Sequence, residues 1–410
     1  DAVADVVCDE FGKKLYIRTF AYTSSEYDNI VGCLSHVSNQ DIILMMKETP
    51  HDFFLTHPNN SFAGKIDRPT IIEFDCSGEF NGQGIIANTW PEHVLRRWSD
   101  FIKRPHIVGY VARTDRYGDT RLIGTPNEIQ LYALSRYTSD TTLTAEQITD
   151  EYISHRYGDA CIPYLKPVFA KAFNITTSVL YTLGTNTAKH SSMDYDPYKS
   201  SYGRHVSGKW VDPPVVYVHH NVEKEFHYWK DIVEHLSPAR FKTSDGPLTE
   251  EAPFVLDSMW VTPTEQMNEE YLSYVMAEKE YAVSQAEQCL SMIDSLKFLL
   301  PEEDFTHLRN MYERTLLTAR LHKAISAAYW GYRIYARGEQ WRNQSLFNLI
   351  DSSLKESLVV ADEIDNYAGF VPIGQWKWRK DADKARDYYK KITEGWEEYD
   401  NIAFPVSLTE

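Results

Sequence analysis

The sequence predicts an α/β fold, the second half of a (β/α)8 TIM barrel, followed by a large all-α domain. Short apolar runs alternate with helix-like segments over residues 1–140, which is typical of a parallel sheet with crossover helices. Over residues 261–410, apolar residues recur at helical spacing in long stretches, which predicts an up-and-down bundle. Residues 141–260 form a helical and irregular aromatic segment that we expect to border the active face.

Four strands and three helices are predicted in the first domain. The strands are expected at residues 14–20, 41–46, 70–76 and 106–112, and the helices at 26–37, 91–103 and 127–136. Four strands make only half of an eight-stranded barrel, and a half barrel leaves its edges open. Residues upstream of Asp1 could complete it, another chain could complete it, or the sheet could belong to a different open α/β fold. We favour the first explanation.

Helix signals continue through the rest of the chain. Thr144 and Gln147 have the spacing of a capping box, so a helix should begin there and continue toward residue 173. Residues 174–260 are expected to be irregular and rich in aromatic side chains. The long helices of the last domain are expected at residues 264–297, 302–337, 343–366 and 378–396.

The charge balance limits the classes of partner. Lys and Arg number 42 and Asp and Glu number 59, which gives a net charge of −17. This balance argues against nucleic acid and against an anionic membrane surface as partners. No apolar run reaches the roughly 20 residues that span a bilayer. An acidic protein can still bind an acidic sugar through a locally basic pocket. Composition leaves secreted, periplasmic and cytoplasmic locations open.

Two carboxylates stand out at the ends of neighbouring predicted strands. Asp52 follows the second strand and Glu79 follows the third, each within a loop of polar residues. The carboxyl ends of barrel strands form the active face, and glycoside hydrolysis commonly uses a pair of acids. The alternative is that both are helix caps or surface acids. The pair therefore makes these two residues candidate catalytic groups.

Cations accompany these acids at the same strand ends. Arg18 and Lys47 could bind a substrate carboxylate, or they could form structural salt bridges to the acids around them. Glu73 and Asp75 share one face of the third strand, and we expect both to form ion pairs. After the fourth strand, the candidate substrate-binding residues are Arg113, Asp115 and Arg116, which could equally lie in a solvated loop.

No metal or cofactor is predicted. The five cysteines are scattered without metal-ligand spacing and are expected to be free, buried thiols. The histidines His190, His219 and His220 do not have the spacing of a metal site, because the pair His219–His220 has no third ligand at helical or hairpin spacing. The chain also has no Gly-x-Ser-x-Gly elbow, no dinucleotide-binding glycine motif and no P-loop.

Several short segments resemble, in the same order, the α-glucuronidases of glycoside hydrolase family 67. The matching segments lie within residues 16–22, 41–64, 73–83, 108–116, 126–132 and 144–158. The clearest are the run from Asp41 through Lys47 to Asp52 and the run from Glu73 to Glu79. The family's Tyr-Thr-Gly-Gln-Gln is here Phe80–Gly84, and this difference leaves the exact sugar and linkage open.

The resemblance implies an inverting hydrolase that removes glucuronic or 4-O-methylglucuronic acid from the end of xylo-oligosaccharides. Asp52 and Glu79 match the two carboxylates that activate the attacking water. Lys47 and Arg18 match residues that contact the uronic acid. The resemblance also implies no metal, a general acid upstream of Asp1, and dimerisation through the C-terminal helices. Two alternatives stay open: a related exo-glycosidase for another sugar, and a non-catalytic carbohydrate-binding protein on a degenerate barrel.

Overall fold

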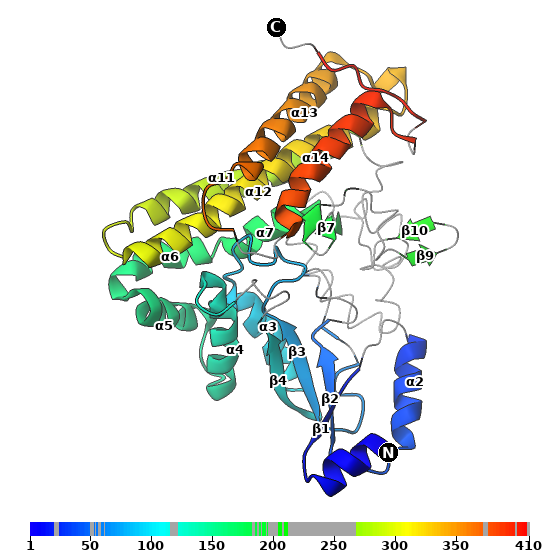
Figure 1. Ribbon diagram of the computed structural model, residues 1–410, viewed down its shortest axis with the longest axis vertical. Coiled ribbons are helices and arrows are strands. Elements are labelled where there is room, and N and C mark those ends of the chain that lie inside the picture. Colours follow the sequence, from blue (N-terminus) through cyan, green and yellow to red (C-terminus); the bar gives the residue numbers. More distant parts are fainter. Residues whose placement is uncertain are drawn as a thin grey trace.

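The computed structural model describes most of the chain outside the segment from residue 212 to 267. The described residues are 1–19, 24–49, 53, 55, 59–60, 62–114, 122–182, 185–186, 188–189, 191–193, 195, 204–206, 209–211, 268–371, 376–397 and 400–407. They form a mixed α/β structure with a parallel four-stranded sheet and many helices. Figure 1 shows the sheet at one end and the long C-terminal helices at the other.

The sheet confirms the four predicted strands, with small shifts at their ends. They are β1 (Leu15–Arg18), β2 (Ile42–Lys47), β3 (Thr70–Asp75) and β4 (Ile107–Arg113). They pair in the order β1-β2-β3-β4 and all run parallel. Lys47 lies opposite Glu73, and Asp75 lies opposite Arg113. The register therefore brings the charged strand ends to one edge of the sheet.

Helices pack beside this sheet as the sequence predicts. They are α2 (Ser24–Ser35), α3 (Pro91–Phe101) and α4 (Ile129–Ser139). Proline at its first position starts α3 without loss of a helical hydrogen bond. The ring of Phe74 on β3 meets Trp98 and Phe101 of α3 edge-on, at centroid distances of 5.9 and 6.3 Å. Phe74, Trp98 and Phe101 are all almost fully buried, so this aromatic contact fixes α3 against β3.

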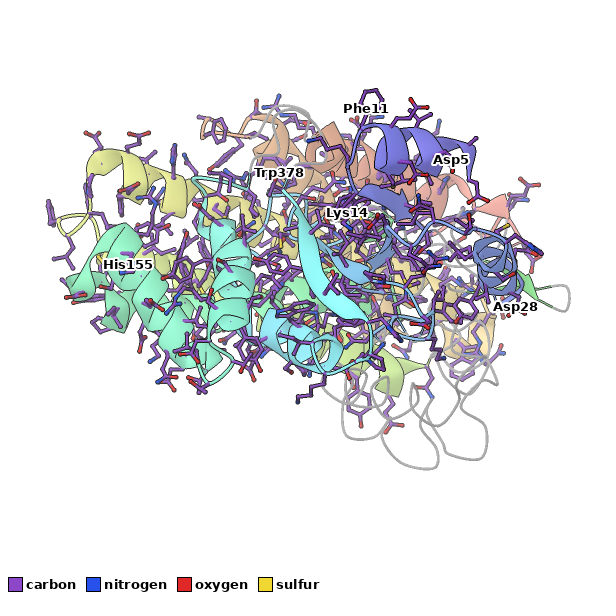
Figure 2. The ribbon with its side chains drawn as sticks, turned by 90° about the horizontal axis from the view of Figure 1, so that it is seen from below. Asp5, Phe11, Lys14, Asp28, His155 and Trp378 are labelled. Carbon is purple, nitrogen blue, oxygen red and sulfur yellow. The ribbon has the colours of Figure 1, made fainter. Side chains whose placement is uncertain are left out.

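The N-terminus contains a helical segment that the sequence analysis did not predict. It consists of α1 (Ala2–Ala4) and a π-helical stretch, η1 (Asp5–Glu10), which bury Ala4 and Cys8. Figure 2 shows this segment and α5 at opposite ends of the molecule, marked by Asp5 and His155. All five cysteines are free, as expected, but Cys33 on α2 is exposed. The expectation of a buried thiol is wrong for Cys33, because it lies on the outer side of its helix.

Three helices lie between the sheet and the long C-terminal helices in the chain. They are α5 (Ala145–Tyr157), α6 (Ile162–Phe169) and α7 (Ala172–Leu180), with a 3-10 turn, η3 (Asp159–Cys161), before α6. Thr144 and Gln147 form both hydrogen bonds of the predicted capping box. Helix α7 corrects the expectation of irregular structure beyond residue 174. Its apolar side chains Ile175 and Val179 are almost completely buried, and this burial outweighs the weak helix propensity of its β-branched residues.

Short elements complete the described parts of the chain. The two-residue strands β5 (Tyr181–Thr182), β6 (Thr185–Asn186), β7 (Ala188–Lys189) and β8 (Ser192–Met193) form two antiparallel pairs, and β9 (Arg204–Val206) pairs with β10 (Lys209–Val211). The 3-10 turns are η2 (Pro126–Glu128) and η6 (Glu339–Trp341).

Long helices are present near the ranges predicted for them in the last part of the chain. They are α11 (Glu269–Asp294), α12 (Glu302–Tyr335), α13 (Gln344–Asp365) and α14 (Trp376–Glu394). Lys279, fully buried on α11, donates to the carbonyl oxygens of Ser178 (2.6 Å) and Tyr181, which joins α11 to the end of α7. Burial lowers the pKa of Lys279. None of the described helices is long and apolar enough to cross a membrane.

A substitution at Gly82 tests how tightly the loop after β3 is built. Gly82 has φ +101°, and an added Cβ would lie 2.0 Å from Cγ1 of the buried Ile86. We expect Gly82→Ala to lower the free energy of unfolding by about 2–4 kcal/mol, through backbone strain and overpacking. Gly32→Ala in α2 is the control, because its Cβ meets nothing within 4 Å and alanine favours the helix. Urea unfolding should show opposite signs for the two variants.

Candidate functional site

The loop that follows β3 is fixed by the carboxylate of Asp75. This carboxylate accepts the backbone N–H of Glu79 at 2.6 Å and the hydroxyl of Ser77 at 2.6 Å. The chain then passes through positive φ angles at Gly78 (+70°), Gly82 (+101°) and Gln83 (+48°). Left-handed backbone at a residue other than glycine is strained and is found where the surrounding structure enforces it. The loop therefore fixes the backbone at Glu79.

Side chains of helix α12 form hydrogen bonds to the backbone of this loop. Arg314, almost fully buried, donates to the carbonyl oxygens of Ile85 and Gly84, both at 3.3 Å. The hydroxyl of Thr315 accepts the N–H of Ala87 at 3.1 Å. Burial lowers the pKa of Arg314 to about 10, so the guanidinium stays charged at neutral pH. The C-terminal helices thus position the loop from a distant part of the chain.

Ser191 completes the support of the loop. Its hydroxyl oxygen accepts the N–H of Gly82 at 2.8 Å, and it donates to the carbonyl oxygen of Glu79 at 2.7 Å. Ser191 has φ +64° and precedes β8, which is itself held by the carboxylate of Asp381 on α14. Three segments far apart in the sequence therefore converge on one loop.

Arg113 at the end of β4 forms an ion pair with Glu79. Its Nη1 lies 2.7 Å from Oε2 of Glu79 and 3.9 Å from Oδ1 of Asp75, and its Nε lies 3.9 Å from Oε1 of Glu73. Burial works against the charge of this guanidinium, but Asp75, Glu79 and Glu73 together outweigh burial and raise the pKa of Arg113. One guanidinium thus serves three carboxylates. The shortest of the three contacts, to Glu79, is a direct hydrogen bond that orients its carboxylate.

Arg18 and Lys47 lie at the same edge of the sheet. Arg18 binds Glu73 with two hydrogen bonds, of 2.7 and 3.1 Å, which is the ion pair expected for Glu73. The Nζ of Lys47 and the Cζ of Arg113 each lie 5.0 Å from the ring centroid of Phe53. Four of the predicted residues, Arg18, Lys47, Glu79 and Arg113, are thus brought together. The three cations lie among the carboxylates of Glu73, Asp75 and Glu79, so positive and negative charges alternate at this edge.

Two buried charged residues behind this edge were missed by the sequence analysis. Glu48 accepts the N–H of Asp75 at 3.2 Å and faces Arg97 of α3 at 3.5 Å. Burial raises the pKa of Glu48 to about 7 and the pKa of Asp75 to about 6. The signal for Glu48 was its position directly after a buried strand. Its partner Arg97 could not be inferred, because it lies on a helix much later in the chain.

The remaining predicted site residues lie outside the described residues. They are Asp52, Asp115, Arg116, His190, His219 and His220. Within the described ranges, no group of three or more His, Cys, Asp and Glu side chains is arranged to hold a metal ion.

The comparisons with known proteins give no family. No family model matches this chain. No curated protein matches it. The geometry of the strand ends and the resemblance of the short sequence segments are therefore the two indications of function.

The raised pKa of Glu48 makes stability depend on pH. Between the ordinary value of 4.5 and about 7, the folded state binds more protons than the unfolded state, so the free energy of unfolding falls as the pH rises. The contribution of Glu48 is on the order of 3 kcal/mol across this window. Glu48→Gln should make this fall less steep, and the part that remains up to about pH 7 belongs to Asp75, whose pKa is about 6.

Denaturant unfolding at pH 6.0, 6.5, 7.0 and 7.5 measures the slope. The matched control is Glu287→Gln, which changes an exposed glutamate on α11 and should keep the wild-type slope. An unchanged slope in Glu48→Gln would contradict the assignment of this titration to Glu48.

Proposed function

We propose that this protein is an inverting glycoside hydrolase that removes a terminal glucuronic or 4-O-methylglucuronic acid from plant or algal oligosaccharides. The observation that carries the proposal is the carboxylate of Glu79, fixed in a strained loop at the carboxyl edge of a parallel sheet and paired with Arg113 at 2.7 Å. Such a position is where barrel hydrolases hold their acids. Substrates of this class include fragments of xylan.

The sheet order supports a barrel as the finer form of the fold. The strands β1 to β4 neighbour one another in chain order, as strands do around a (β/α)8 barrel. A doubly wound open sheet instead reverses its strand order at a switch point. In this proposal the four strands are the second half of a barrel, followed by an all-α domain.

Glu79 has the role of a general base in this proposal. It takes a proton from a water molecule that attacks the anomeric carbon from the side opposite to the leaving oxygen. Asp52 shares the positioning of that water, and a general acid protonates the leaving oxygen. Arg113 orients the carboxylate of Glu79, and Asp75 holds the backbone of Glu79.

The cations at the strand ends give the proposal its substrate preference. A uronate approaching a chain of net charge −17 meets Lys47 and Arg113 at the ring of Phe53. The side chain of Arg18 is 39 % exposed although it pairs with Glu73, so one side of its guanidinium faces the solvent. These three cations would offset the repulsion of a sugar carboxylate by the neighbouring acids.

Removing the base should stop turnover without stopping binding. We expect Glu79→Gln to lower kcat on aldouronic oligosaccharides about 10²–10⁴-fold in the full-length protein. Proton NMR of the wild-type reaction should show the β-anomer of the released uronic acid first, because attack inverts an α-linkage. Added azide should restore turnover of Glu79→Ala, because azide attacks without a base. Glu287→Gln is the control for loss of an exposed acid.

Full activity of Glu79→Gln, or release of the α-anomer first, would contradict the proposal. If the folded wild-type protein, checked by circular dichroism, turns over neither aldouronic nor neutral oligosaccharides, a carbohydrate-binding protein would be favoured. If only oligosaccharides with a neutral terminal sugar are cleaved, an exo-glycosidase for a sugar other than a uronic acid would be favoured.

Lys47 tests the preference for a charged sugar. We expect Lys47→Met to raise KM for substrates that carry the uronate about tenfold, the loss typical of a charge-assisted hydrogen bond. For the matched neutral substrate, which has glucose in place of glucuronic acid, the KM of Lys47→Met should equal that of the wild type. Lys103→Met removes an exposed cation after α3 and is the control. An equal rise for both substrates would show that Lys47 acts on the fold and not on the uronate.

A further inference from the structure

A small buried cavity lies between the strand ends and α3. It has a volume of about 20 Å³, and every residue that lines it is at most 9 % exposed. One water molecule needs about 10–15 Å³ of such space. The cavity therefore has room for a single water molecule and for no larger ligand.

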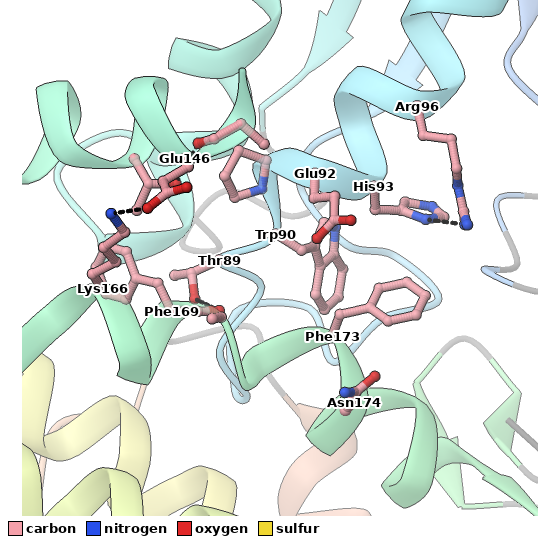
Figure 3. A pocket seen from close by; sticks show the side chains of 14 residues that line it. Thr89, Trp90, Glu92, His93, Arg96, Glu146, Lys166, Phe169, Phe173 and Asn174 are labelled. Carbon is pink, nitrogen blue, oxygen red and sulfur yellow. Dashed lines mark hydrogen bonds and ion pairs between the residues drawn. The ribbon is translucent and has the colours of Figure 1, made fainter. Parts of the chain in front are cut away.

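Two rings at the start of α3 form one wall of this cavity. The rings of Trp90 and His93 meet edge-on with their centroids 6.5 Å apart, and both side chains are buried. The same two side chains line a larger cavity of about 420 Å³, which Figure 3 shows from close by. The two cavities therefore share a wall, and the small one lies on its buried side. A ligand held there should exchange slowly with the solvent.

The side chain of Asn81 supplies an acceptor in the lining of the small cavity. Asn81 lies in the loop after β3 and is 4 % exposed. Among the residues that the structure describes, none donates a hydrogen bond to its buried Oδ1. A buried amide oxygen without a donor costs folding free energy, and native proteins rarely leave one unsatisfied. A ligand in the cavity that carries an O–H group would satisfy this oxygen.

The carboxylate of Glu48 is a second acceptor in the same lining. Its Oε1 accepts the N–H of Asp75 at 3.2 Å, and its Oε2 lies 3.5 Å from Nε of Arg97. A carboxylate has about four lone-pair sites, so these two contacts leave it able to accept again. Because burial raises the pKa of Glu48 to about 7, its protonated form is also present at neutral pH. Water both donates and accepts, so it can bind to either form.

The surroundings of the cavity argue against an ion. The guanidinium of Arg97 faces Glu48, and it also donates to Nε2 of His93 and to Oδ1 of Asn59. This charge would repel a second cation. A calcium or magnesium ion would also need about six oxygen ligands, for which a cavity of this size has no room. An anion would meet the carboxylates of Glu48 and Asp75. The lining therefore favours a small neutral ligand.

We propose that this cavity binds one internal water molecule, which donates hydrogen bonds to Oδ1 of Asn81 and to the carboxylate of Glu48. The water joins the loop after β3 to the residue that follows β2. Because Asn81 follows Glu79 in the same loop, the water also helps to fix the backbone that carries Glu79. It binds whether or not Glu79 acts as a base.

A high-resolution crystal structure of the full chain tests the site directly. We expect density for one water molecule within hydrogen-bond distance of Oδ1 of Asn81 and of the Glu48 carboxylate. In solution, oxygen-17 relaxation dispersion counts the long-lived internal waters. Asn81→Leu, which keeps the size of the side chain but removes the acceptor, should hold one such water fewer than the wild type. Asn348→Leu changes an exposed asparagine on α13 and is the matched control.

Val94→Leu is a second variant that leaves Asn81 intact. Val94 is buried and lines the cavity, so the larger side chain should fill the space and also remove one long-lived water. Thermal unfolding midpoints show whether each variant is folded. If Asn81→Leu does not fold, Val94→Leu and the wild-type density decide the question.

Three results would overturn the proposal: a wild-type cavity without a water molecule, an unchanged number of long-lived waters in both variants, or density with about six oxygen ligands at 2.0–2.6 Å, which would identify a cation. Glu79→Gln should keep this water even if it abolishes hydrolysis, so the water site and the proposed hydrolase site are tested separately.

Discussion

The candidate site depends on one guanidinium, that of Arg113, surrounded by three carboxylates. Glu73, Asp75 and Glu79 all lie at the end of β3 or directly after it, and in a largely dry environment their mutual repulsion would be severe. A buried ion pair that loses one partner costs about 3–5 kcal/mol. Arg113 therefore stabilises the strand ends and at the same time orients Glu79. Because β4 supplies Arg113 and β3 supplies the acids, the parallel register of these two strands is a condition for the site.

The loop after β3 shows how distant parts of the chain create a local geometry. Glycine makes the left-handed turns accessible, but it also leaves the unfolded loop many alternatives. The loop is restricted by contacts from three separate segments: Asp75 within the sheet, Ser191 before β8, and Arg314 on α12. The long C-terminal helices are thus more than an appended bundle. Their side chains position the backbone that carries Glu79.

Strands and long helices could be predicted because their signal is local. The apolar runs of a parallel sheet and the helical period of a bundle depend on neighbouring residues only. The helix α7 escaped prediction because Ile175 and the threonines beside it have weak helix propensity, and burial against α11 and α12 decided the outcome. Within the candidate site, Glu79 and Arg113 were visible as charges at strand ends. The pairing of Glu48 with Arg97 was not, because a tertiary contact between β2 and α3 has no local pattern.

A continuous chain of polar contacts runs from His93 on α3 to the strand-end site. Arg97 donates to His93 and faces Glu48, Glu48 accepts from the backbone of Asp75, and Asp75 accepts from the backbone of Glu79. Each member satisfies a buried group of the next, which is the condition under which buried charge is tolerated. Burial raises the pKa of both Glu48 and Asp75, so part of the folding energy is spent on keeping these acids in place. A fold that only needed stability would fill these positions with apolar side chains. The retained charges are therefore best explained by the geometry that they impose on Glu79.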